Sequence, residues 1–374
     1  MKLRRFLPVT ALGIGLFVAT IAAEGCSSSS SGTTGTGGAG LKPPGPPAGA
    51  AAATLGAPRT FALQSLLLGG TKRDGSPSDS AWKDYGYDLD NKTTTAKSTD
   101  VCKLADGAQK AAQTDGTLGT DNAFGQTILP IITSVAATAE TDISKSLTDG
   151  AFTIMLDIQG LTDDAAQNNI GLSGQIFAGG QYDPNKMAPG FDLMTDWPVR
   201  PELLKDMKTV ASGSTVQFDS TNTYVVDGQF VTKADLKLSL SVGGTGLELS
   251  IHQAIITFKH SDPHTAATGT IAGIIKTEEL IDGLRKVAGR LQKALCEGAA
   301  FDQIAQEIRQ ASDIMSDGPN VAGPSCDGIS IGLGFVAKEI KHPTKVADLA
   351  APSADPCKAA PDGGGATDSG STDQ

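Results

Sequence analysis

The sequence predicts an α+β protein whose main domain consists mostly of antiparallel β-strands in a sandwich-like arrangement, with a packed C-terminal helical hairpin. Apolar and polar residues alternate along several segments between residues 59 and 349, which is the period of a strand with one buried face. Two segments within residues 277–315 instead repeat their apolar residues every three or four positions, as amphipathic helices do. These two periods together define the predicted fold class.

The clearest alternation lies in the second half of the chain. Leu236 begins an apolar alternation that continues to residue 242, and the same pattern restarts at Leu247 after a glycine-rich stretch. Just upstream, two apolar segments flank Asp227 and Gly228, a pair that tolerates positive φ at both turn positions. We therefore expect a tight hairpin followed by two long strands.

The remaining elements follow from the same two periods. Further strands are expected at residues 61–68, 152–158, 172–177 and 329–335. Thr277 is expected to cap the first helix, because two glutamates follow it and favour a helix N-terminus. The two helices should pack together on the sheet.

Composition shifts divide the chain into four parts. Residues 1–25 have a basic start and an apolar run, which are typical of a secretion signal. Residues 26–58 are rich in Ser, Gly and Pro and are expected to form a disordered tether. Residues 59–349 form the globular domain, and residues 350–374 are expected to be a disordered acidic tail.

The charge balance narrows the range of partners. The chain has 30 Lys and Arg against 41 Asp and Glu, and aromatic residues make up only 5% of it. Nucleic acid and anionic lipid surfaces require a basic face, and stacking on bases or sugars requires aromatic residues. The sequence therefore predicts no nucleic-acid partner.

The end of the N-terminal apolar run resembles the lipobox of bacterial lipoproteins. Ala23, Glu24 and Gly25 precede Cys26, and in that family the cysteine is acylated and becomes the first residue of the mature chain. The resemblance implies a lipid anchor on Cys26 and a place in the cell envelope, at the outer membrane or cell surface. Glu24 departs from the small or aliphatic residue of the pattern. Ordinary cleavage near Ala23, which leaves Cys26 unmodified, is the alternative.

Four cysteines lie beyond Cys26, namely Cys102, Cys296, Cys326 and Cys357. An even number of cysteines in an exported protein predicts two disulfides. Cys296 and Cys326 are nearest in sequence and bracket a helical segment, so we expect them to pair. Cys102 would then pair with Cys357, although the spacing leaves the other connectivities open.

Two acidic stretches form the candidate metal site. Asp88 and Asp90 lie in the first, and the second contains Asp115, Asp121 and Asn122. Several oxygen ligands on a backbone that turns sharply suit a hard cation such as Ca²⁺, so these residues are candidate ligands of a structural calcium ion. Asp and Asn also favour turns for their own sake, and a loop without a cation is the alternative.

Residues 328–332 match the Gly-x-Ser-x-Gly pattern of a nucleophile elbow. That elbow requires a strand–turn–helix context, whereas Ser330 lies within a strand pattern, and only Glu339 and His342 could complete a triad in the α/β-hydrolase order. We therefore expect no catalysis at Ser330. His260 and His264 flank a proline turn and are expected to be surface residues rather than metal ligands.

These observations favour a lipid-anchored, non-catalytic binding or structural protein with an unidentified extracellular or periplasmic ligand. The alternative is a secreted hydrolase or glycan-binding protein whose site residues are scattered along the chain. Paired carboxylates of the glycosidase type cannot be singled out among 41 acidic residues.

Overall fold

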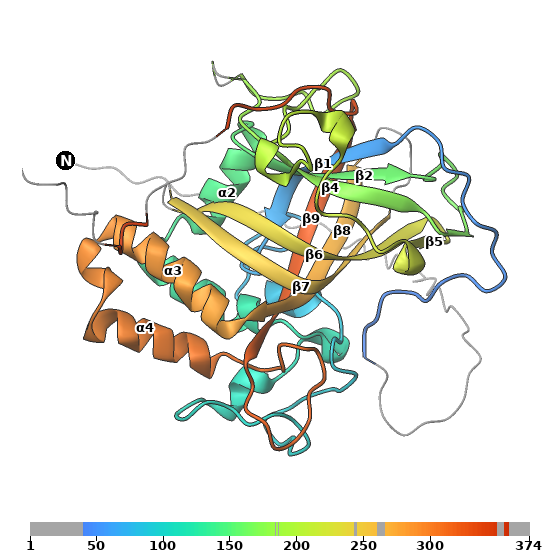
Figure 1. The fold of residues 1–374 in the computed structure, drawn as a ribbon. Helices are drawn as coiled ribbons and strands as arrows, with labels where there is room; N and C mark the ends of the chain where they lie inside the picture. Colours follow the sequence, from blue (N-terminus) through green and yellow to red (C-terminus); the bar gives the residue numbers. More distant parts are fainter. Residues whose placement is uncertain are drawn as a thin grey trace, which may run out of the picture. The chain divides into compact units, whose positions relative to one another are not determined.

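The computed structural model describes residues 40–349, except for residues 184, 186, 243, 244 and 260–265, together with residues 355–358. The strands in this part of the chain are β1 (Arg59–Leu67), β2 (Thr153–Gln159), β3 (Asn169–Ile170), β4 (Ser173–Gly179), β5 (Tyr224–Val226), β6 (Gln229–Val242), β7 (Thr245–Lys259), β8 (Ala266–Lys276) and β9 (Gly328–Ile340). The α-helices are α1 (Leu129–Val135), α2 (Ala139–Thr148), α3 (Thr277–Leu291) and α4 (Ala299–Gln310) (Figure 1).

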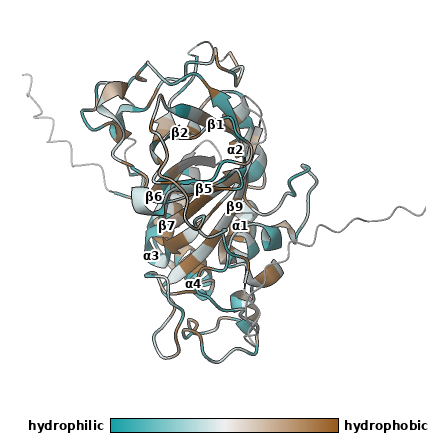
Figure 2. Ribbon diagram, turned by 90° about the vertical axis from the view of Figure 1, so that its right-hand side faces the viewer, coloured by the Kyte–Doolittle hydropathy of each residue, from teal (hydrophilic) through white to brown (hydrophobic). Residues whose placement is uncertain are grey.

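These strands form one curved sheet in the order β3-β5-β6-β7-β8-β9-β1-β2-β4, and all its paired strands are antiparallel. Helix α2 contacts both β1 and β6, although three strands separate them, so the sheet curves around the helix as a half-barrel. Hydrophobic residues concentrate on the strands around β7 and β9 (Figure 2). The predicted α+β class with a mostly antiparallel sheet is confirmed. The described strands include no second sheet, so the sandwich is not confirmed.

The hairpin predicted at Asp227 and Gly228 is present between β5 and β6. Val226 pairs with Gln229, and the two turn residues have φ of 47° and 72°. Both central residues of a type I′ turn need positive φ, which explains why this dipeptide forms it. The alternation beyond the turn also buries its apolar residues, with Leu236 only 2% exposed.

Strand β2 differs from the expected half-buried strand, because both of its faces are covered. Ile154 and Leu156 face the main hydrophobic core, whereas Met155 lies in a second cluster with Phe177 and Trp197. Trp197 belongs to the long connection between β4 and β5. That connection folds over the outer face of the sheet and buries it.

Both expected helices are present as α3 and α4, and their apolar positions Leu284 and Ile308 are buried. Thr277 is not a cap: it is the first residue of α3, and its hydroxyl contacts the Ser312 hydroxyl at 2.7 Å. An exposed bidentate ion pair between Arg309 and Glu278 connects the two helices. Among the residues that the structure describes, no helix is both long and apolar enough to cross a bilayer.

The segment before β1 lies along the domain. The Leu41 amide donates a hydrogen bond to the Leu118 carbonyl oxygen at 2.7 Å, and the Asp88 amide donates to the Leu41 carbonyl oxygen at 2.8 Å. Further along, the Ala53 amide donates a hydrogen bond to the Ile170 carbonyl oxygen on edge strand β3. The part of the expected tether from residue 40 onwards is thus hydrogen-bonded to the domain.

Candidate functional site

Five aspartates from distant parts of the chain meet beside β9. We call Asp88, Asp90, Asp115, Asp121 and Asp313 the acidic cluster. One carboxylate oxygen from each of Asp88, Asp90 and Asp121 lies within 4.8 Å of the others, and all three side chains are buried. Asp115 is within side-chain hydrogen-bonding reach of Asp121, and the Asp313 carbonyl oxygen accepts a bond from Asn320, whose side chain also bonds Asp90.

Close backbone packing positions the first acidic loop. A Cβ atom on Gly332 of β9 would lie 2.1 Å from the Tyr85 carbonyl oxygen, so only glycine allows the loop to approach the strand this closely. Gly86 has a φ of +120°, which favours glycine as well. The loop therefore turns directly against the sheet and brings the aspartates that follow to the surface of β9.

Asn122 connects the two acidic loops to β9 through hydrogen bonds. Its side-chain amide donates to the carbonyl oxygens of Trp82, Tyr85 and Gly332, and its oxygen accepts from the amides of Gly125 and Gly332. Both the nitrogen and the oxygen of this predicted calcium ligand are therefore already bonded to the backbone. These bonds join the two acidic loops to β9.

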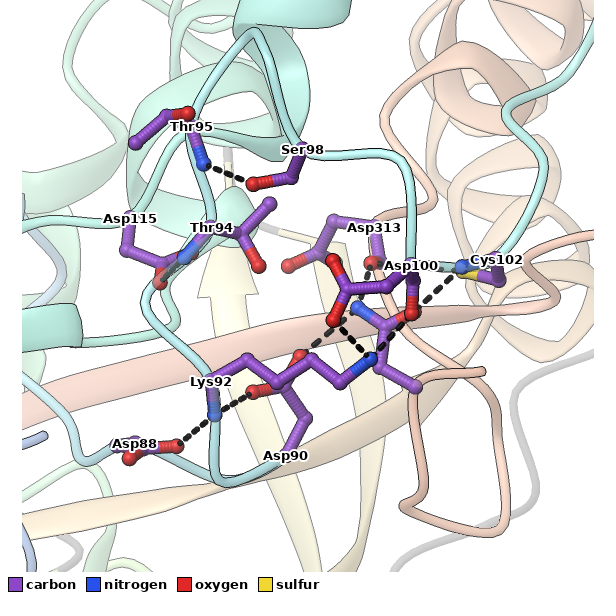
Figure 3. Close-up of polar contacts among 11 residues, drawn as sticks. Asp88, Asp90, Lys92, Thr94, Thr95, Ser98, Asp100, Cys102, Asp115 and Asp313 are labelled. Atoms are coloured by element: carbon purple, nitrogen blue, oxygen red, sulfur yellow. Dashed lines mark hydrogen bonds and ion pairs between the residues drawn. The ribbon is translucent and has the colours of Figure 1, made fainter. Parts of the chain in front are cut away.

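Backbone amides supply most of the hydrogen bonds to the cluster. The Lys92 amide donates to both Asp88 and Asp90, and the Leu89 amide donates to Asp121 at 2.7 Å. These bonds fold the loop around its own carboxylates, as is common in Asx-type turns. The Lys92 side chain forms an ion pair with Asp100 at 2.9 Å (Figure 3), and its charge also acts on Asp90.

Asp313 and Asn320 complete the inner side of the cluster. Asp313 accepts bonds from the Ser330 amide at 2.9 Å and hydroxyl at 2.6 Å. The Asn320 side chain donates to Asp90 at 2.8 Å. Both residues lie more than 190 positions beyond the acidic loops, and no local feature of the sequence indicates that they belong to this site.

Burial dominates the electrostatics of the cluster. Loss of hydration raises the pKa of Asp115 and of Asp313 to about 7, and it raises the pKa of Asp121 well above its ordinary value, with repulsion from neighbouring aspartates adding to the effect. Lys42 is 3.9 Å from Asp88, and its side chain is 42% exposed. A raised pKa means that these carboxyl groups keep a proton to higher pH, so burial suppresses part of the negative charge of the cluster.

One buried polar atom at this site has no partner. The Thr94 hydroxyl is buried without a hydrogen bond, whereas its backbone amide donates to Asp115. In Figure 3 the hydroxyl points away from Asp115 and towards Asp313. Buried hydroxyl groups normally have a partner, so this one needs an explanation.

The four cysteines form two disulfides, as predicted, but the favoured pairing is wrong. Cys102 is bonded to Cys326, and Cys296 is bonded to Cys357. Proximity in the sequence suggested a bond between Cys296 and Cys326, but the fold carries the first acidic loop to the start of β9 and so brings Cys102 to Cys326. The Cys102 amide also donates to Asn320, the residue that bonds Asp90, so this disulfide fastens the acidic cluster.

The Gly-x-Ser-x-Gly match at residues 328–332 is part of strand β9, as the strand pattern around Ser330 indicated. Ser330 is fully buried, and its hydroxyl is bonded to Asp313 and to the amide of Ala123. Glu339 instead binds Arg59 on β1, and His342 binds Asp157. These three residues therefore do not form a triad. His260, His264 and the proposed lipidation site Cys26 lie outside the described residues.

A second polar site lies at the other end of the sheet. The buried carboxylate of Asp157 accepts hydrogen bonds from Thr60 at 2.6 Å, from His342 Nδ1 at 2.9 Å and from Gln175 at 2.9 Å. The bond to Asp157 raises the pKa of His342. Asp157, Gln175 and His342 line a pocket of about 260 Å³ together with Gln159. The sequence did not indicate this pair, since its members lie 185 residues apart.

Comparison of the chain with protein-family models, curated proteins and solved structures gave no match.

Proposed function

We propose that this protein is exported and anchored to a membrane of the cell envelope by lipid on Cys26, where it acts as a non-catalytic binding or structural protein. The N-terminal sequence pattern supports the anchor, and the remainder of the tether after Cys26 separates it from the domain. In this proposal α3 and α4 pack as a hairpin against the sheet, and the domain presents its surface to an extracellular or periplasmic ligand.

The observation that carries export is the pair of disulfides. Each one joins segments that are far apart in the chain, with separations of 224 and 61 residues. Such bonds form and persist in oxidising compartments and are rare where thiols are kept reduced. All four cysteines beyond Cys26 are paired with one another in disulfides. Cys26 is therefore available for the lipid that the N-terminal pattern predicts.

Metabolic labelling with a radioactive fatty acid tests the anchor in the bacterial host. We expect wild-type protein to carry label and to sediment with membranes, whereas Cys26→Ala loses the label and appears in the soluble fraction. The neighbouring substitution Ser27→Ala is the matched control and should behave as wild type. Intact mass showing an unmodified Cys26, or cleavage near Ala23, would overturn the proposal.

The second candidate function is a hydrolase or glycan-binding protein, which the polar pocket beside His342 favours. Asp157 orients Nδ1 of the imidazole, which leaves Nε2 to accept a proton from a substrate, as a general base does. A panel of ester, peptide and glycoside substrates and a glycan array would test this function. Turnover or binding that disappears in His342→Gln would support it over the non-catalytic role.

A further inference from the structure

We propose that the acidic cluster binds one structural divalent cation of the calcium class, which the unpartnered hydroxyl of Thr94 faces. The inference goes beyond the proposed function and does not depend on the lipid anchor. Four observations support it: the spacing of the carboxylates, the unpartnered Thr94 hydroxyl, the charge around the site and the kinds of ligand atom present.

The spacing of the carboxylates fits a single ion. Calcium–oxygen distances are about 2.3–2.6 Å, so two ligands on opposite sides of one ion are about 5 Å apart. The oxygens of Asp88, Asp90 and Asp121 lie within 4.8 Å of one another and can therefore reach the same ion. Asp115 is within side-chain hydrogen-bonding reach of Asp121 and would add a further oxygen, as a cation of high coordination number requires.

The Thr94 hydroxyl is an independent sign of a ligand. The side chain is only 3% exposed, and its oxygen is the one buried side-chain polar atom without a partner in the described part of the chain. It points towards Asp313, a member of the acidic cluster (Figure 3). A cation, or a water molecule bound to it, would provide the missing partner, because a hydroxyl oxygen is a suitable ligand for calcium.

The charge around the site also favours a cation. Buried carboxylates are costly unless a positive charge or a proton compensates them. Among the described residues, Lys42 pairs with Asp88 at 3.9 Å through an exposed side chain, and the charge of Lys92, which pairs with Asp100, also acts on Asp90. Asn320 and the backbone amides contribute dipoles but no charge. A bound divalent ion would compensate the ionised carboxylates in place of these protons.

The ligand atoms select the class of metal. Every group in the cluster offers oxygen, and the described residues place no histidine or cysteine thiolate among these ligands. Zinc and copper prefer nitrogen and sulfur, whereas magnesium retains most of its water and rarely takes a cage of protein ligands. Several carboxylates and a hydroxyl on a tight loop fit calcium best.

Terbium luminescence and thermal unfolding test the site on the mature, oxidised chain. Terbium resembles calcium and is sensitised by nearby aromatic rings. Tyr87 directly precedes Asp88, and Asn122 bonds the backbone of Trp82. We expect excitation of these rings to give terbium emission that calcium displaces and magnesium does not at equal concentration. We also expect saturating calcium to raise Tm by about 3 °C or more over chelator, by preferential binding to the folded state.

Variants separate a metal site from a purely structural cluster. Asp121→Asn keeps the shape of the side chain but removes a ligand charge. It should weaken calcium binding by about tenfold or more, as the loss of one ionic ligand does, without lowering Tm in chelator. Asp302→Asn, at an exposed position on α4, is the matched control and should bind calcium as wild type does.

The Thr94 variants test the hydroxyl. Thr94→Val removes the hydroxyl at nearly constant shape, and Thr94→Ser keeps it. If the hydroxyl faces an ion, Thr94→Val should reduce calcium affinity several-fold and Thr94→Ser should not, while neither variant lowers Tm in chelator by more than about 2 °C. A gain in Tm for Thr94→Val in both calcium and chelator would show that the hydroxyl has no ligand, and it would overturn this part of the proposal.

Three other results would overturn the cation site. Equal Tm in calcium and chelator, with no terbium emission, would mean that shared protons alone hold the carboxyls together. Preferential binding of zinc would contradict the metal class. An equal loss of calcium binding in Asp302→Asn and Asp121→Asn would indicate nonspecific screening of surface charge.

Discussion

Buried aspartates occur in two regions of this molecule, and the two regions satisfy them in different ways. Asp157 receives hydrogen bonds from three side chains on separate segments, and one of them, His342, can carry a positive charge. The acidic cluster gathers five carboxyl groups whose donors are mainly backbone amides and the side chains of Asn320 and Ser330. The chain satisfies Asp157 with its own side chains, whereas the carboxyl groups of the acidic cluster have only Lys42 at 3.9 Å from Asp88 and the charge of Lys92 on Asp90 as cationic partners among the described residues.

Removal of the disulfide beside the acidic cluster should have the largest effect on the free energy of unfolding. We expect Cys102→Ser/Cys326→Ser to lower the free energy of unfolding by about 5 kcal/mol, because that bond closes the longer loop, and Cys296→Ser/Cys357→Ser to lower it by about 4 kcal/mol. Urea unfolding of the oxidised proteins measures both. A larger loss for the second pair would contradict the role of Cys102–Cys326 in bracing the acidic region.

A smaller effect tests the contact between the acidic loop and β9. Gly332→Ala would place a methyl group 2.1 Å from the Tyr85 carbonyl oxygen, so the loop must shift, at a cost of about 1–3 kcal/mol in the free energy of unfolding. Gly45→Ala is the control, because a Cβ atom there meets no atom within 4 Å. Wild-type stability for Gly332→Ala would show that the loop does not depend on this close approach.

The smallest effect concerns the region of Asp157. Since the pKa of His342 is higher in the folded than in the unfolded protein, the protonated imidazole stabilises the fold at a pH below its ordinary value of 6.5. This contribution is lost as the pH rises through the higher folded pKa. His342→Gln should therefore cost more stability at about pH 5.5 than at about pH 8.5.

Thermal unfolding across that pH range measures the difference between wild type and His342→Gln. In an Asp157→Asn background the same substitution should show almost no dependence on pH, because the partner of the imidazole no longer carries a charge. A constant difference between the two proteins at every pH would mean that the pair is not the source of the shift.

Local pattern was enough to identify most of the elements of this fold. Alternation located the long strands from Leu236 onwards, and the positive-φ pair Asp227 and Gly228 defined a hairpin, because each signal depends only on neighbouring residues. The helical period placed α3 and α4 for the same reason. Clustering of acids along the chain likewise indicated Asp88, Asp90 and Asp121 as neighbours in space.

The tertiary structure decided which distant segments meet. It placed β1 between β9 and β2, covered the outer face of β2 with the connection that carries Trp197, and joined Cys102 to Cys326. It also brought Asp313 to the acidic loops. None of these contacts leaves a periodic trace in the sequence, since each depends on how the whole sheet curves and packs rather than on the conformation of nearby residues.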